Sequence, residues 1–211
     1  MSLVTRAHGR FIFPRRVRRL AGHFARVLPP EASVLDVGAG DGLLDRLLLD
    51  LRPDLSLRAI DVLERPETHV PVEWFDGVHL PCPEGSVDWA IFVDVLHHAD
   101  DPEALLHTAA SAARHGIVVK DHLAEGRVDD ATLRLMDWVG NAGHGVRLPY
   151  HYWSRARWRE ALGRLALVPT LWTERLGLYP FPASVVFERG LHFLARLEPH
   201  PPAGGAGTAT G

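Results

Sequence analysis

Cysteine and lysine are almost absent from the 211-residue chain, and long apolar runs are missing altogether. Because Cys82 is the only cysteine, a disulfide framework and a cysteine-based zinc site are both excluded, which indicates a reducing compartment. No stretch approaches the ~18 apolar residues of a membrane span, and the N-terminus lacks the apolar segment of a secretory signal. We therefore expect a cytoplasmic protein without a membrane partner.

The chain also lacks a strong excess of one charge. Its formal net charge is −3, whereas a dedicated nucleic-acid-binding protein usually carries a basic excess, so we expect no nucleic-acid partner. Seven arginines and no acid occur in the first thirty residues, but apolar residues from Val17 to Leu28 recur at helical spacing. This pattern predicts a packed amphipathic helix opened by Pro14 rather than a transit peptide, and we interpret its arginines as a solvated face.

What the chain does have is a regular alternation of strand and helix patterns. Such alternation is typical of parallel strands joined by right-handed crossovers, with helices on both faces of one sheet. Ligands of these sheets bind beyond the carboxyl ends of the strands. The predicted strands cover residues 32–37, 55–61, 70–75, 89–93 and 117–120, and the predicted helices cover residues 43–51 and the segment from Asp101, as N-cap, to Gly116.

Three glycines lie in five positions directly after the first strand, in VLDVGAGDG at residues 34–42. Such a cluster indicates a sharp turn or the close approach of a ligand to the backbone. The dinucleotide-binding pattern G-x-G-x-x-G would need a glycine at position 43, where Leu43 stands. An NAD-dependent reductase is therefore disfavoured, although it stays an alternative.

Residues 36–42 match the pattern E/D-x-G-x-G-x-G at every defined position. They resemble the first motif of class I S-adenosylmethionine-dependent methyltransferases. Residues 80–106, LPCPEGSVDWAIFVDVLHHADDPEALL, are similar to the fourth-strand region of the small-molecule branch often called type 11. The resemblance implies a doubly wound, Rossmann-like α/β fold: a seven-stranded, mostly parallel sheet with an antiparallel C-terminal pair and helices on both faces.

The resemblance further implies S-adenosyl-L-methionine as the cofactor. In the family an acid at the end of the second strand, here Asp61, accepts hydrogen bonds from the two ribose hydroxyls, for which a carboxylate has enough acceptors. An acid after the third strand, here Asp76, commonly receives the adenine amino group. The implied cofactor contacts are Asp36, Gly38, Ala39, Gly40, Gly42, Asp61, Val62, Asp76, Gly77 and Asp94.

One methyltransferase domain is expected over residues 1–197. Residues 31–120 form its cofactor-binding half, residues 121–154 a lid or substrate insertion, and residues 155–197 a helix capped by Ser154 followed by the antiparallel pair. The two strands of that pair are expected over residues 167–174 and 183–188. Residues 198–211 lack an apolar stripe and are expected to be a disordered tail.

Acid–base candidates come mainly from the insertion. Residues 136–154 are rich in Trp, Tyr, His, Asn and Gly, which suits a lid that orders around a substrate; the alternative is an ordinary loop anchored by its aromatic residues. Because the chain holds 13 histidines, any single one is weak evidence for catalysis. The catalytic candidates are His151, Tyr150, His144 and His98.

A second possibility is a metal site after the fourth and fifth strands. Asp94, Asp121 and His122 resemble in placement the ligands of magnesium-dependent catechol methyltransferases, in which two acids and an asparagine hold the ion. Imidazole is a poor ligand for magnesium, which prefers oxygen, so we expect no bound metal.

These observations predict an S-adenosyl-L-methionine-dependent methyltransferase that acts on the oxygen, nitrogen or carbon of a small-molecule acceptor. The alternatives are RNA or protein methylation, a non-catalytic cofactor-binding or regulatory module, and the reductase considered above. The sequence identifies neither the acceptor nor the oligomeric state.

Overall fold

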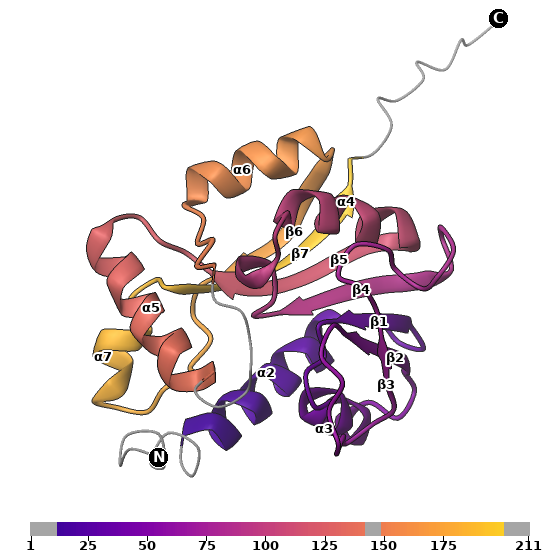
Figure 1. The fold of residues 1–211 in the computed structure, drawn as a ribbon, viewed down its shortest axis with the longest axis horizontal. Coiled ribbons are helices and arrows are strands. Elements are labelled where there is room, and N and C mark those ends of the chain that lie inside the picture. The colour runs from indigo at the N-terminus through magenta and orange to yellow at the C-terminus, as the bar shows by residue number, and fades with distance from the viewer. Residues whose placement is uncertain (1–11, 142–148, 201–211) are drawn as a thin grey trace, which may run out of the picture.

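The computed structural model describes residues 12–141 and 149–200, which fold around one seven-stranded sheet; Figure 1 shows its arrangement. The strand order is β3-β2-β1-β4-β5-β7-β6. All neighbouring pairs from β3 to β5 are parallel, whereas β7 runs antiparallel to both β5 and β6. The predicted fold class is confirmed. The strands are β1 (Ser33–Val37), β2 (Ser56–Asp61), β3 (Val72–Trp74), β4 (Val87–Val93), β5 (Ala113–His122), β6 (Leu167–Thr173) and β7 (His192–Pro199).

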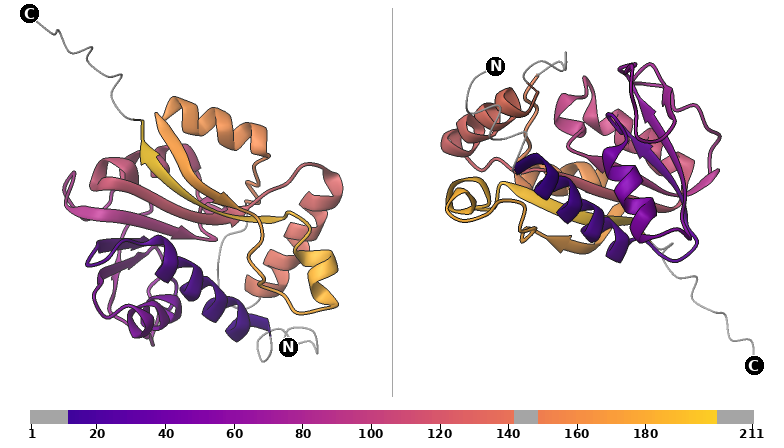
Figure 2. Two further views of the ribbon diagram at one scale, coloured as in Figure 1. Left: turned by 180° about the vertical axis from the view of Figure 1, so that it is seen from behind. Right: turned by 90° about the horizontal axis from the view of Figure 1, so that it is seen from below.

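Helices cover both faces of the sheet (Figure 2). On one face the apolar residues of α2 and α3 pack against Trp89, Ile91 and Val118 of the central strands. On the other face α4 and α6 pack against Ala90, Phe92 and neighbouring residues. The helices are α2 (Phe13–Val27), α3 (Leu43–Leu51), the 3₁₀ helix η2 (Leu96–His98), α4 (Pro102–Ala112), α5 (Arg127–Asn141), α6 (Arg155–Arg164) and α7 (Ala183–Phe187).

Local sequence signals fix where two of these helices begin. The side chain of Asp101 accepts the Ala104 N–H at the start of α4, and Pro102 occupies the first turn. The Ser154 hydroxyl likewise accepts the Arg157 N–H at the start of α6. Both predicted caps are confirmed. No helix in the described ranges is long and apolar enough to cross a membrane.

The predicted last strand was wrong. Residues 183–188 hold the short helix α7, and the strand that pairs with β5 and β6 is β7. A strand between two others needs buried side chains on both faces, and β7 has them, whereas α7 contains no buried residue. Residues 198 and 199, which were expected to begin a disordered tail, belong to β7. Residues 201–211 lie outside the described residues.

Gly116 was also misassigned as the end of a helix. The helix α4 ends at Ala112, and Gly116 lies within β5 with φ of +146°. A Cβ atom there would lie 2.1 Å from the carbonyl oxygen of Leu197 in β7. Glycine is needed at this position because the neighbouring backbone approaches so closely.

Candidate active site

The glycine loop between β1 and α3 is held against the end of β2 by its own backbone. The N–H groups of Gly38 and Ala39 both donate to the Ile60 carbonyl, at 2.8 and 3.0 Å. The Gly40 N–H donates to Oδ2 of Asp61 at 2.7 Å. Gly40 has φ of +66°, and no described atom lies within 4 Å of the position that a Cβ would take there. The loop therefore turns as predicted and leaves open space beside Gly40.

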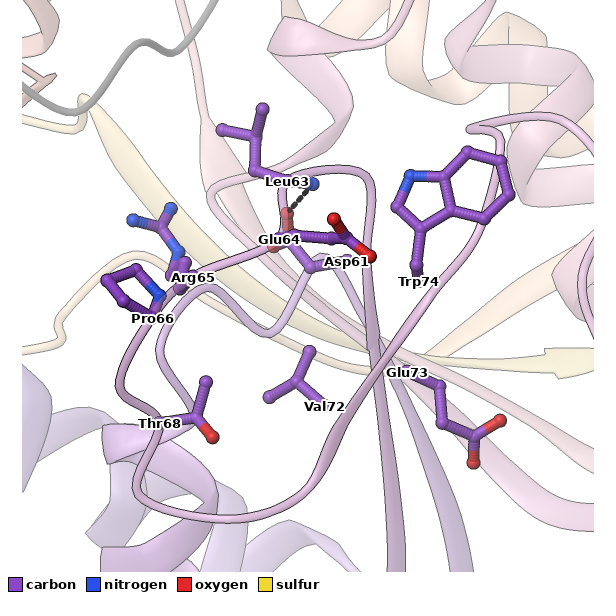
Figure 3. Close-up of a pocket in the computed structure, with 9 residues that line it drawn as sticks. All are labelled: Asp61, Leu63, Glu64, Arg65, Pro66, Thr68, Val72, Glu73 and Trp74. Atoms are coloured by element: carbon purple, nitrogen blue, oxygen red, sulfur yellow. Dashed lines mark hydrogen bonds between the residues drawn. The ribbon is translucent and has the colours of Figure 1, made fainter.

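Asp61 is buried at the carboxyl end of β2 and organises the loops on both sides of it. One carboxylate oxygen accepts the Gly40 N–H. The other accepts the Leu63 N–H at 2.8 Å, a bond that Figure 3 shows. Each oxygen has a second lone pair for a further donor. A pocket of about 450 Å³ opens next to Asp61, between the loop that follows β2 and strand β3. Of the ten implied cofactor contacts only Asp61 lines this pocket.

Three further implied contacts, Val62, Asp76 and Gly77, lie in the loops that follow β2 and β3. A Cβ on Gly77 would lie 3.3 Å from a methyl carbon of Val62. Asp76 accepts the N–H groups of Val78 and His79 and also contacts the His79 ring. These hydrogen bonds lower the pKa of Asp76 and hold it ionised. The geometry thus makes Asp76 a fixed acceptor at the end of β3.

Asp36, in β1 two residues before Gly38, interacts with the side chain of Asp45, which the sequence analysis missed. Asp45 is in the first turn of α3 and is fully buried. Burial, together with the second carboxyl, raises the pKa of Asp36 well above its usual range. Burial also raises the pKa of Asp45 to about 6. This pair therefore retains a proton under mildly acidic conditions.

Asp94 directly follows β4 in a left-handed conformation, with φ of +58°, and is held by two cations. Lys120 of β5 contacts Oδ1, and Arg16 of α2 contacts Oδ2 at 3.1 Å. Although burial acts in the opposite direction, these cations hold the pKa of Asp94 well below its usual range. Arg16 is thus not part of a solvated face, and Lys120 is fully buried. A cofactor contact from Asp94 would have to share the carboxylate with both.

A buried cluster of histidine and aspartate side chains lies next to the group formed by Asp94, Lys120 and Arg16. It lies where η2, β5 and α5 meet. Nδ1 of His97 lies 2.6 Å from Oδ1 of Asp121, and Nε2 lies 3.3 Å from Oδ2 of Asp137. The Tyr152 hydroxyl donates to the same oxygen of Asp137. Burial opposes a charge on His97, but the two carboxylates raise its pKa to about 10. Burial and the nearby Lys120 lower the pKa of His122 to about 4, so that ring is neutral.

The end of the expected lid docks on this cluster. The His151 N–H donates to the His97 carbonyl at 3.1 Å, and its ring donates from Nδ1 to the Ala99 carbonyl at 3.0 Å. His98 is half-buried and its ring lies 4.0 Å from that of His97, centre to centre. Tyr150 lies beneath the guanidinium of Arg134. Three of the four catalytic candidates thus lie near one edge of the sheet; His144 lies outside the described residues.

The sequence analysis missed Asp137 and His192 in this region. Asp137 belongs to the buried face of α5, four residues after the fully buried Leu133. An acid at an inward position of an amphipathic helix was the available signal. His192 begins β7 and lies 3.3 Å from the Lys120 ammonium. It could not be placed while the last strand was assigned to the wrong segment.

Comparison with known proteins identifies the class. Residues 7–166 match a family of methyltransferase domains, and this span is more than half of the chain. The chain therefore belongs to this methyltransferase family. Family and fold together imply S-adenosyl-L-methionine as the cofactor. The site fits that molecule, because the buried Asp61 offers acceptors for hydroxyl donors and the open side of Gly40 admits a close ligand.

Individual relatives are more distant. A ubiquinone biosynthesis O-methyltransferase of Xanthomonas campestris pv. campestris (strain B100) is 34% identical over 104 residues, which cover 44% of this chain and 43% of that protein. The chain thus spans less than half the length of this curated relative.

Two solved structures match nearly the whole fold. A putative methyltransferase in complex with the Haloferax volcanii Trm112 methyltransferase activator has a TM-score of 0.62 at 16% identity, over 95% of this chain and 99% of that one. An S-adenosylmethionine-dependent methyltransferase from Mesorhizobium loti has a TM-score of 0.59 at 18% identity, over 84% and 96% of the two chains. At such identities the similarity establishes the fold alone.

Proposed function

We propose that this protein transfers a methyl group from S-adenosyl-L-methionine to a small molecule bound at the carboxyl edge of β4 and β5. The observation that carries the proposal is the Gly40–Asp61 hydrogen bond, which ties the glycine loop to the acid at the end of β2. An acceptor oxygen is the first choice, because the Xanthomonas campestris relative is an O-methyltransferase. When bound, the cofactor supplies a methyl group on a sulfonium, which brings its own leaving group.

The chain's own residues would position the acceptor and receive its proton. His151 donates from Nδ1 to the Ala99 carbonyl, so its Nε2 carries the lone pair and is free to act as a base in this tautomer. His98 and Tyr150 lie on the same edge and would orient the acceptor. Such a base contributes a factor of ~10² to 10⁴, whereas positioning can contribute ~7–11 kcal/mol.

Ligand-dependent melting tests the cofactor half of the proposal. S-Adenosylhomocysteine should raise the melting temperature, because a ligand that binds only the folded state stabilises it, and NADH should not. Stabilisation by NADH alone would instead favour the reductase.

A methyl-transfer assay tests the acceptor half. Candidate hydroxylated small molecules are compared with total RNA and with a protein lysate as acceptors, which separates the alternatives. His151→Ala should then lower turnover by ~10² or more with unchanged S-adenosylhomocysteine affinity. His115→Ala, an exposed histidine at the other end of β5, is the matched control. Equal losses in the two variants would refute a role for His151.

A further inference from the structure

Histidine and aspartate side chains from η2 and α5 converge at the edge of β5, outside the implied cofactor contacts. One ligand atom each from His97, His98 and Asp137 lies within 4.8 Å of the others. We propose that these three residues bind a divalent transition-metal ion of the zinc type. Two imidazoles and one carboxylate suit zinc, iron(II), cobalt or nickel better than magnesium. This set differs from the Asp94-based set considered on the sequence, for which no metal was expected.

The spacing between two of the ligand atoms fits such an ion. Nε2 of His97 lies 3.3 Å from Oδ2 of Asp137. Two atoms bound at about 2.0–2.1 Å in a tetrahedral zinc site lie about 3.3–3.4 Å apart. Apart from this contact, the same Nε2 makes no hydrogen bond to the described residues, although His97 is only 2% exposed. A metal ion between Nε2 and Oδ2 would bind both atoms of this buried pair.

Nδ1 of His97 has the support that metal-bound histidines usually have. It lies 2.6 Å from Oδ1 of Asp121, whose two oxygens are held in turn by the N–H groups of Leu96 and His122. A carboxylate in this place keeps the ring proton on Nδ1 and directs the Nε2 lone pair toward the ion. Tyr152 plays a similar part for Asp137, to which its hydroxyl donates.

Asp94 is excluded from the set by its partners. Lys120 and Arg16 already compensate its charge, and both contact its oxygens directly. Asp121 and Asp137, in contrast, face His97 from its two sides. If His97 is neutral, as a metal ligand must be, a dication compensates these two carboxylates instead.

Three protein ligands leave a coordination position open, which is typical of a catalytic metal site. The His151 N–H bonds to the His97 carbonyl, which holds the proposed base next to one of the three ligand residues. On the basis of the proposed function, the ion would bind an acceptor oxygen and favour its deprotonated form.

Metal titration of the whole chain, without a histidine tag, tests the proposal. The protein is dialysed against EDTA and then against buffer, and it is titrated with Co²⁺ by visible absorption and with Zn²⁺ by calorimetry. We expect one equivalent to bind, with d–d bands of a four- or five-coordinate cobalt ion. His98→Ala and Asp137→Asn should each weaken binding by ~100-fold or more, and Asp121→Asn by ~10–100-fold. His115→Ala, exposed and remote, should leave the affinity unchanged.

Two outcomes would overturn the proposal. Weak binding of several equivalents, reduced equally by His115→Ala, would mean that surface histidines bind the metal. No binding at all would make His97 a purely structural imidazolium between two carboxylates. S-Adenosylhomocysteine binding, measured on the same samples, reports whether each variant is folded, and it also keeps failure of this proposal distinguishable from failure of the proposed function.

Discussion

Two parts of the sheet's carboxyl edge carry polar groups, the loop edge beyond β1 and β2 and the β4–β5 edge, and they are built in different ways. At the glycine loop, residues 38–63 hold one another mainly through backbone N–H groups that donate to Ile60 and Asp61. At the β4–β5 edge, buried and partly buried side chains from α2, η2, β5, α5 and β7 contact one another. The first edge depends on backbone conformation, whereas the second depends on the balance of buried charge.

This difference implies different responses to substitution. Hydrogen bonds from backbone amides survive most side-chain changes, but a buried charge that loses its partner is strongly destabilising. We therefore expect the largest losses of stability at the β4–β5 edge, and effects on cofactor affinity at the loop.

The largest effect is expected for Lys120→Met. This change removes a fully buried ammonium and leaves the Asp94 carboxylate with Arg16 as its remaining cation. Breaking a buried pair typically costs ~3–5 kcal/mol, and we expect about 3 kcal/mol because Arg16 remains. Denaturant unfolding measures the loss. The control is Arg58→Met, which breaks the exposed ion pair with Glu73 and should cost ~1 kcal/mol or less. If both variants lost the same free energy of unfolding, burial of the ion pair would not explain the loss in Lys120→Met.

A smaller loss is expected for Gly38→Ala. Gly38 has φ of +85°, and a Cβ there would lie 2.5 Å from a methyl carbon of Val95. The left-handed conformation alone costs a non-glycine residue ~1–2 kcal/mol, so we expect at least about 2 kcal/mol in denaturant unfolding. Gly40→Ala, which meets no described atom, should cost less stability but more S-adenosylhomocysteine affinity. If Gly40→Ala lowered the S-adenosylhomocysteine affinity less than Gly38→Ala, the cofactor would not bind beside Gly40.

The loop edge, which is built from residues close in sequence, could largely be predicted from the sequence. The glycine loop and Asp61 lie within one short stretch whose spacing is itself the signal, and the caps at Asp101 and Ser154 are equally local. These features and the two-sided helical cover were accessible to motif and periodicity, whereas the seven-stranded sheet with its antiparallel pair was implied by the family resemblance. In each case the contacting residues are close in sequence, so the sequence motif itself predicted the contact.

The β4–β5 edge could not be predicted in this way. His97 meets Asp137 across forty residues, and Lys120 meets His192 across seventy-two. Such contacts depend on how α5 docks and on which segment forms the last strand. That strand was misassigned because residues 183–188 favour strands by composition, whereas tertiary pairing selected β7.

At the loop, Asp61→Ala tests whether the carboxylate serves the cofactor. The change removes the acceptor of the Gly40 and Leu63 N–H groups and of the expected ribose hydroxyls. We expect S-adenosylhomocysteine affinity to fall about tenfold or more, which corresponds to ~1.4 kcal/mol. Calorimetric titration measures the affinity, and Glu64→Ala, next in the same pocket lining, is the control. An unchanged affinity in Asp61→Ala would show that the loop binds the cofactor without this acid.

The smallest effect is a pH dependence at the buried carboxyl pair of Asp36 and Asp45 beside the loop. Burial raises the pKa of Asp45 to about 6, above its value in the unfolded chain, so the folded protein binds more protons near pH 5. Stability should therefore fall as pH rises through 6, by ~1 kcal/mol between pH 5 and 7.5. In Asp45→Asn this part of the pH dependence should vanish. Asp50→Asn, on the same helix but exposed and paired with Arg46, should keep the wild-type slope, because the pKa of Asp50 is lowered and lies below the window. Unfolding curves at five pH values measure the slope, and parallel curves for the wild type and Asp45→Asn would show that Asp45 does not titrate in this range.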